Sequence, residues 1–221
     1  MNKQPNSPNI PDSYMLYSGR SLIHNVLEHA SGSLIYFLFI ILFERLTGLM
    51  ADSPSKESTS FYYIFYPVLV SFMMMQNQFT KEDPGGKLFR TIKGGFATYV
   101  RYHIGLNTVV VISAILFSSI AVLLGDLGLI SINNGITDFM KISLSCISSL
   151  TIFNMIFPRI MNKGVLIALF ILSTLIISMI YFIIIPADKI TPYIVICVAE
   201  AVLLPLSILS YVRCYKRKYW T

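Results

Sequence analysis

Residues 164–185, GVLIALFILSTLIISMIYFIII, contain no charged side chain and form one continuous apolar stretch. An α-helix needs about 20 such residues to cross the hydrocarbon core of a bilayer. In a helix, a single segment also satisfies its own backbone hydrogen bonds away from water. This stretch therefore predicts a membrane-spanning helix.

Similar apolar stretches lie elsewhere along the chain. Hydrophobic residues make up 55% of the sequence and charged residues only 13%, against roughly 25% in soluble proteins. We predict an all-α integral membrane protein in which residues 1–221 form a single transmembrane domain. The six predicted transmembrane helices cover about 31–50, 60–76, 104–124, 136–157, 164–185 and 192–212.

The segment before the first span has a different character. Residues 1–11, MNKQPNSPNIP, are rich in proline and asparagine and are predicted to be disordered. Residues 12–30 predict an amphipathic helix lying in the membrane interface, with a solvated helix as the alternative. Its apolar stripe comprises Leu22, Ile23, Val26, Leu27 and Ala30.

Basic residues divide unevenly between the two sides of this layout. One side collects Lys3, Arg20, Lys81, Lys87, Arg90, Lys93, Arg101, Arg159, Lys163, Arg213, Lys216, Arg217 and Lys218. The rest of the 17 Lys and Arg residues, which lie on or near the other side, are Arg45, Lys56, Lys141 and Lys189. Because cytoplasmic loops carry the excess of Lys and Arg, both termini and residues 76–103 are predicted to be cytoplasmic. We expect a multi-pass protein of the bacterial plasma membrane.

The longest polar break lies between the second and third predicted spans, at residues 76–103. Within it, residues 86–93, GKLFRTIK, are enclosed by the turn signal Asp83-Pro84-Gly85-Gly86 and by Gly94-Gly95. A helix here would be short and amphipathic, suited to docking on a soluble protein or on lipid phosphates. Its apolar side comprises Leu88, Phe89 and Ile92, and its basic side Lys87, Arg90 and Lys93.

Glu200 lies near the middle of the last predicted span. A charged side chain there costs about 3 kcal/mol on insertion scales, so Glu200 must face protein or water rather than lipid. It is either part of a transport path or a packed structural residue. The span 136–157 carries small polar residues that favour close helix packing over a path. The candidate translocation-path residues are Glu200, Lys141, Ser145 and Ser148.

Several function classes find no support in the sequence. The net charge of +6 gathers at the ends of apolar runs, unlike a nucleic-acid-binding surface. The three cysteines and the scattered histidines show no metal-binding spacing, so no metal site is predicted. HExxH, GxSxG and Walker A motifs are missing, so we predict no catalytic residue and no cofactor in this chain. If ATP and Mg²⁺ are used, a partner subunit must bind them.

The layout resembles the small membrane subunits of ABC exporters of the type-2 permease family. The similarity rests on the N-terminal amphipathic helix, six spans with both ends inside, and residues 79–103, FTKEDPGGKLFRTIKGGFATYVRYH. It implies that Lys87, Leu88, Phe89, Arg90, Ile92 and Lys93 form a coupling helix on a cytosolic ATPase. It also implies a homodimer, or a heterodimer with a sister permease, that exports a peptide, an antimicrobial or another amphipathic compound.

Two other classes remain open. One is the substrate-capture subunit of a vitamin-uptake transporter, and the other is a membrane-embedded immunity or regulatory protein that acts by binding. A membrane enzyme ranks third, because no cluster of polar residues suits catalysis. An ATPase gene beside this one would favour transport.

Overall fold

The computed structural model describes residues 95–128, 135–159, 163–185 and 189–219. It also describes helical backbone at Ile23, Leu27, Ser31, Gly32, Leu34, Ile35, Leu38, Phe39, Ile41 and Leu42. The predicted tail 1–11, the span 60–76 and the coupling helix lie outside the described residues. So does most of the interfacial helix and of the first span.

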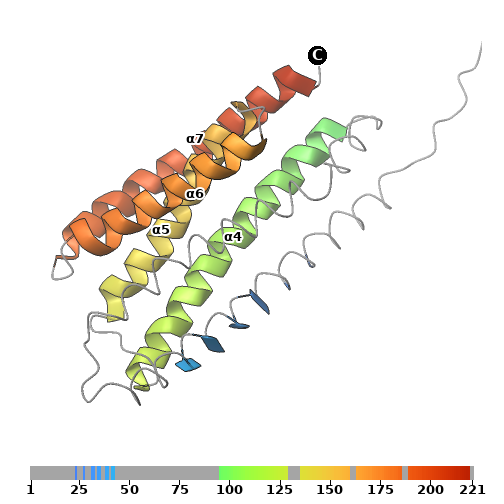
Figure 1. The fold of residues 1–221 in the computed structure, drawn as a ribbon. Helices are drawn as coiled ribbons and strands as arrows, with labels where there is room; N and C mark the ends of the chain where they lie inside the picture. The colour runs from blue at the N-terminus through green and yellow to red at the C-terminus, as the bar shows by residue number, and fades with distance from the viewer. Residues whose placement is uncertain are drawn as a thin grey trace, which may run out of the picture.

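The described part is all-helical, which confirms the predicted class (Figure 1). Its elements are α4 (Gly95–Asp126), α5 (Gly135–Ile156), the short 3₁₀ helix η1 (Phe157–Arg159), α6 (Lys163–Met179), the π-helix η2 (Ile180–Ile184) and α7 (Thr191–Tyr219).

Four of these helices are long and apolar enough to cross a membrane. They are Gly95–Asp126, Gly135–Arg159, Gly164–Ile184 and Thr191–Arg217, and they coincide with the last four predicted spans. Two helices extend beyond the apolar stretch: α4 begins before residue 104, and α7 continues past residue 212. These extensions contain Tyr99 and Tyr215, which stack on each other with ring centroids 4.3 Å apart.

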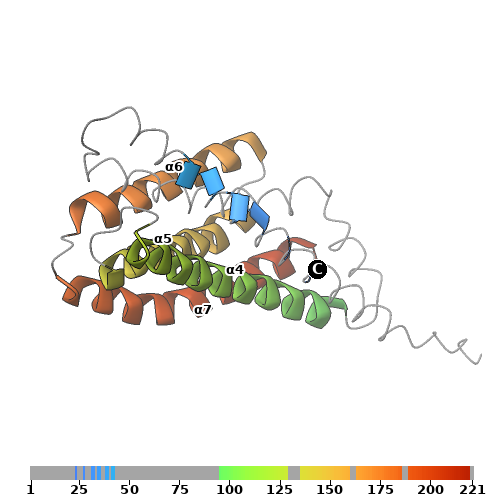
Figure 2. The same ribbon diagram turned by 90° about the horizontal axis from the view of Figure 1, so that it is seen from below.

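Helix α5 lies at the centre of the described part and contacts α4, α6 and α7. Figure 2 shows α6 on one side of α5 and α7 on the other. In its most apolar window α5 is 67% buried, against 28% for α4, 28% for α6 with η2, and 11% for α7. The least apolar of the four helices is therefore the most buried, as expected where lipid surrounds the protein and polar groups turn inward.

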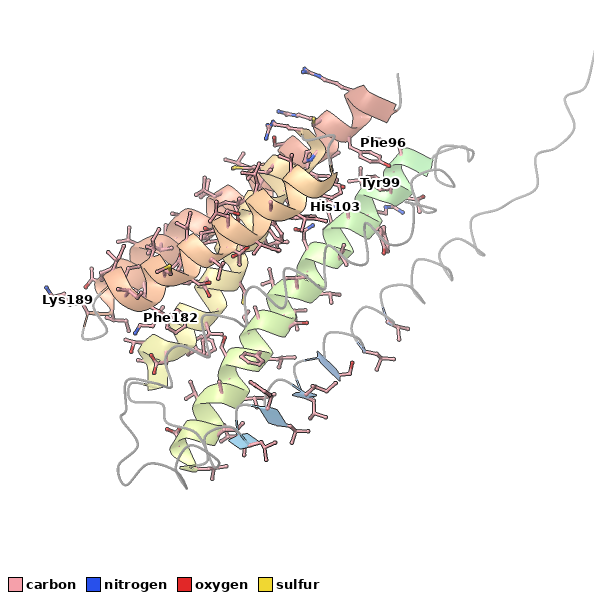
Figure 3. The ribbon with its side chains drawn as sticks, in the orientation of Figure 1. Phe96, Tyr99, His103, Phe182 and Lys189 are labelled. Carbon is pink, nitrogen blue, oxygen red and sulfur yellow. The ribbon has the colours of Figure 1, made fainter. Side chains whose placement is uncertain are left out.

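Successive helices run in alternating directions, so α5 and α7 are parallel to each other. The start of α4 and the ends of α5 and α7 meet at one end of the bundle, here called the basic end. Its basic residues are Arg101, Arg159, Arg213, Lys216 and Arg217. Phe96, Tyr99 and His103 lie toward this end, whereas Phe182 and Lys189 lie toward the opposite end (Figure 3).

The largest apolar cluster joins α4, α5 and α6. It comprises Val110, Ala114, Phe117, Ala121, Ile142, Cys146, Leu150, Phe153 and Phe170. Gly135, at the start of α5, lies so close to α4 that a Cβ atom there would be 3.3 Å from Val122 Cγ1. This tight packing of α4 on α5 positions the polar residues of the two helices relative to each other.

Candidate functional site

Helix α7 has an inverted distribution of polar and apolar side chains. Its buried side chains, among those described, are Tyr193, Glu200, Ser207, Tyr211 and Tyr215. All five carry a polar group, and their spacing of four or seven residues places them in one stripe. The exposed face is apolar and includes Ile194, Val195, Val198, Val202, Leu206 and Leu209. Helix α7 therefore turns polar groups toward its neighbours and apolar groups toward lipid.

Glu200 is 8% exposed, and its carboxylate is bound by two hydroxyl groups of α5. Ser148 Oγ donates to Oε1 over 2.6 Å, and Thr151 Oγ1 donates to Oε2 over 2.7 Å. Ser148 and Thr151 lie three residues apart, which places them on the same side of α5. Through these two bonds, Glu200 links α7 to α5.

Tyr181 adds a third helix to the site. Its hydroxyl oxygen lies 2.9 Å from Ser148 Oγ. The single proton of Ser148 is already donated to Glu200, so the Tyr181 hydroxyl must be the donor in this contact. The resulting chain runs from Tyr181 to Ser148 to Glu200. We call Glu200, Ser148, Thr151 and Tyr181 the carboxylate cluster.

Tyr181 lies in the π-helix η2, where the Ile185 backbone N–H donates to the Ile180 carbonyl over 3.1 Å. This bond spans five residues instead of four, so the helix is wider here than in α6. The extra residue changes the direction of the side chains that follow relative to a regular helix. π-Helical turns are rare and occur frequently at functional sites.

No Lys, Arg or His of the described segments forms an ion pair with Glu200. Lys141, the basic residue of α5 within the bundle, pairs with Asp138 instead, at an Nζ–Oδ1 distance of 3.5 Å. The Lys141 ammonium also lies 5.8 Å from the ring centroid of Phe182. The hydroxyl groups of the carboxylate cluster are thus the neighbours that stabilise the carboxylate.

The predicted path residues separate into two groups. Glu200 and Ser148 are in direct contact, whereas Ser145 donates to the Ile142 carbonyl of its own helix over 2.9 Å, and Lys141 is held by Asp138. Sequence reasoning missed Thr151 and Tyr181. Because Thr151 comes three residues after Ser148, the sequence could have predicted that the two share a helix face. No feature of the sequence predicts the π-helix on which Tyr181 lies. The six coupling residues between 87 and 93 lie outside the described residues.

A second polar cluster lies toward the basic end. His103 Nε2 is 3.1 Å from Asn154 Oδ1, Asn154 Nδ2 donates to Asn107 Oδ1 over 2.7 Å, and Asn107 Nδ2 donates to the His103 carbonyl over 2.8 Å. With hydrogen on Nε2, these three bonds close a ring. All three side chains are at most 2% exposed. We call His103, Asn107 and Asn154 the imidazole cluster.

Aromatic rings join the imidazole cluster to α7. The His103 ring stacks on Tyr211 with centroids 3.9 Å apart, and the Tyr99 and Tyr211 hydroxyl groups are 3.0 Å apart. The sequence offered no sign of this role, since its three histidines are scattered along the chain. Its partners Asn154 and Tyr211 are distant along the chain, so only the folded structure brings them together.

Further polar contacts link α5 and η1 to α7 at the basic end. Arg159 donates to Ser210 Oγ over 2.9 Å and also to the Met155 carbonyl. Cys214 Sγ lies 3.6 Å from the Pro158 carbonyl oxygen. The parallel pair α5 and α7 is therefore joined by polar groups from Glu200 to the basic end.

The described residues contain no group of three or more His, Cys, Asp or Glu side chains arranged to hold a metal ion. No protein-family model matches the chain, and no curated protein and no solved structure is significantly similar to it. The physical arrangement of the two clusters must therefore support any functional proposal.

Proposed function

We propose that this protein is the membrane permease subunit of an ATP-driven ABC transporter. It would export a peptide, an antimicrobial or another amphipathic compound, and a separate subunit would bind and hydrolyse ATP. The observation that carries the proposal is Glu200, a buried carboxylate tied to Ser148, Thr151 and Tyr181 from neighbouring helices. Ionisable residues inside a membrane are costly, and they mark substrate or ion pathways often enough to be treated as functional.

A movement of the cytoplasmic loop could reach Glu200 through α4 and α5. Helix α4 begins at Gly95, directly after the predicted coupling segment 86–93. A displacement of that segment by an ATPase would therefore act on a continuous membrane helix. Helix α4 packs on α5, and α5 carries Ser148 and Thr151. These successive contacts, from α4 to α5 to Glu200, support the proposal that movement of the cytoplasmic loop is transmitted to Glu200.

In this proposal the basic end faces the cytoplasm of a bacterial cell, and two permeases form the transport path. They are two copies of this chain, or this chain with a sister permease. The exposed apolar face of α7 is available for lipid or for the second permease. The proposed arrangement gives each permease its own docking site for an ATPase.

The decisive experiment isolates the protein from its host membranes and asks whether an ABC ATPase co-purifies. Phe89→Asp, which places a charge on the apolar side of the coupling segment, should release the ATPase while the permease still inserts. Thr80→Asp introduces the same charge elsewhere in the same loop and is the matched control. Full retention of the ATPase by Phe89→Asp, or the absence of any ATPase from the native protein, contradicts the proposal.

A further inference from the structure

We infer that the carboxylate cluster is a binding site for a sodium ion. This site goes beyond the proposed ATP-driven activity and would make the state of the membrane helices depend on sodium. We infer it from the chemistry of the ligating atoms, from their net charge, and from two buried hydroxyl groups that precede Tyr181 along α6.

The ligating atoms are all oxygen. The cluster offers the two carboxylate oxygens of Glu200 and the hydroxyl oxygens of Ser148, Thr151 and Tyr181. Each hydroxyl has one proton and two acceptor lone pairs. The same hydroxyls that donate to the carboxylate can therefore rotate and present lone pairs to a cation. Oxygen ligands of this kind select hard cations rather than zinc or copper.

The charge of the site selects a monovalent ion. Glu200 provides one negative charge, and no basic residue of the described segments pairs with it. A single positive charge neutralises the site, whereas a divalent ion would leave one uncompensated positive charge inside the membrane. An uncompensated charge there is expensive.

The tight packing of the oxygens favours sodium over potassium. The three hydrogen-bonded oxygen pairs are 2.6, 2.7 and 2.9 Å apart, and all four side chains are at most 8% exposed. A cation that enters must separate oxygens that are already in contact. The smaller alkali ion needs the smaller displacement.

Two further hydroxyl groups extend the site along α6. Thr174 and Ser178 are 0% exposed, and within the described segments their hydroxyl oxygens have no hydrogen-bond partner. Ser178 lies one turn before Tyr181 and Thr174 lies two turns before it. Both are on the same buried face of α6, toward the basic end. Buried hydroxyl groups are normally satisfied by protein or by water. These two are therefore suited to bind a water molecule beside α6.

The test measures thermal unfolding of the purified full-length protein in detergent, in sodium chloride and in choline chloride of equal ionic strength. A ligand that binds only the folded state should raise Tm by about 3–5 °C for each tenfold rise in sodium above Kd. Potassium should have a smaller effect at every concentration. A wild-type protein whose Tm is the same in sodium and choline overturns the inference.

Two variants localise the response. Glu200→Gln and Thr151→Val, which keep the side-chain shapes, should abolish the sodium-dependent shift or weaken sodium affinity at least tenfold. Thr108→Val is the matched control, because Thr108 Oγ1 donates only to the Ile104 carbonyl of its own helix, over 3.0 Å. An unchanged sodium response in Thr151→Val overturns the inference, even if Glu200→Gln fails to fold.

Protons are the competing ligand. If lowering the pH in choline stabilises the protein while sodium has no effect, and if Glu200→Gln removes the effect of pH, the site binds a proton and sodium is ruled out. The experiment uses the chain without an ATPase. A failure of sodium binding is thus distinguishable from a failure of ATPase docking.

Discussion

The carboxylate cluster and the imidazole cluster are both buried, both polar and both built on α5, yet they solve the problem of burial differently. The imidazole cluster is a ring of neutral groups in which each residue is hydrogen-bonded to the other two. The carboxylate cluster concentrates three hydroxyl groups around one acidic side chain and has no basic partner in the described segments. The first arrangement is complete in itself, whereas the second would be completed by the proposed sodium ion.

This difference assigns the clusters distinct roles. A satisfied neutral network holds helices in one arrangement, and its loss should reduce stability. An acidic group without a basic partner adds less to stability, because its desolvation offsets its hydrogen bonds. In the proposed transporter, Glu200 therefore has a functional role.

The largest expected effect on stability is that of Asn154→Leu. It removes the Asn154 partner of His103 Nε2, which keeps a contact of 3.2 Å with Asn107 Nδ2, and the Asn154 donor to Asn107 Oδ1, all of them buried. Unsatisfied buried groups cost about 1–3 kcal/mol each, although interhelical bonds in membranes average only about 0.6 kcal/mol. We expect a loss of about 2 kcal/mol, seen as a Tm lower by about 4–8 °C.

Ser149→Ala is the control for this change. Ser149 is buried on the same helix, but its hydroxyl donates to the Ser145 carbonyl over 2.7 Å. Its Tm should stay within about 1 °C of wild type. If Asn154→Leu is as stable as Ser149→Ala, the imidazole cluster does not hold the helices together.

Glu200→Leu should show the opposite behaviour. Replacing a buried charged group by an apolar one is often neutral or stabilising, and Ser148 and Thr151 can bond to carbonyl groups of their own helix. We expect a stability change below about 1 kcal/mol, together with at least a tenfold loss of transport-coupled ATP hydrolysis in membrane vesicles, or about 1.4 kcal/mol. Val202→Leu, on the exposed face of α7, is the control. A fully active Glu200→Leu removes the functional assignment.

Tyr181→Phe tests the outer member of the carboxylate cluster with a smaller expected effect. The substitution removes one hydroxyl group that contacts Ser148 rather than Glu200 itself. The loss of one such contact is worth about 1 kcal/mol, so sodium affinity should fall roughly fivefold, as measured from the sodium dependence of Tm. An affinity equal to wild type would confine the ion site to α5 and α7.

Ser145→Ala should have the smallest effect of the series. The Ser145 hydroxyl donates to the Ile142 carbonyl of its own helix and, within the described residues, has no hydrogen bond to either cluster, although the sequence predicted it as a path residue. Tm, sodium response and transport should all match wild type within error. A transport defect in this variant would show that the path extends along α5 beyond Glu200.

Hydropathy and the cost of burying charge predicted a large part of the described structure. The predicted spans 136–157 and 164–185 agree closely with α5 and with α6 plus η2, because a helix that crosses a membrane must be apolar over a fixed length. Glu200 is buried, as the cost of exposing a carboxylate to lipid requires.

The partners of these residues were less predictable. Lys141 lies on the same helix face as Ser145 and Ser148 by sequence spacing. Its ammonium group nevertheless forms an ion pair with Asp138, one turn earlier. Tyr181 reaches Ser148 through a π-helix, and His103 meets Asn154 across 51 residues of chain. Such pairings depend on helix rotation and local backbone geometry, which hydropathy does not record.

The parallel pairing of α5 and α7 has a consequence for biosynthesis. Chains emerge from the ribosome with the N-terminal part first, so α5 and α6 reach the membrane before α7 does. When Glu200 leaves the insertion machinery, Ser148 and Thr151 are already in the bilayer to receive it. The last helix can therefore carry an acidic group at its midpoint without exposing it to lipid, provided that the earlier helices have assembled.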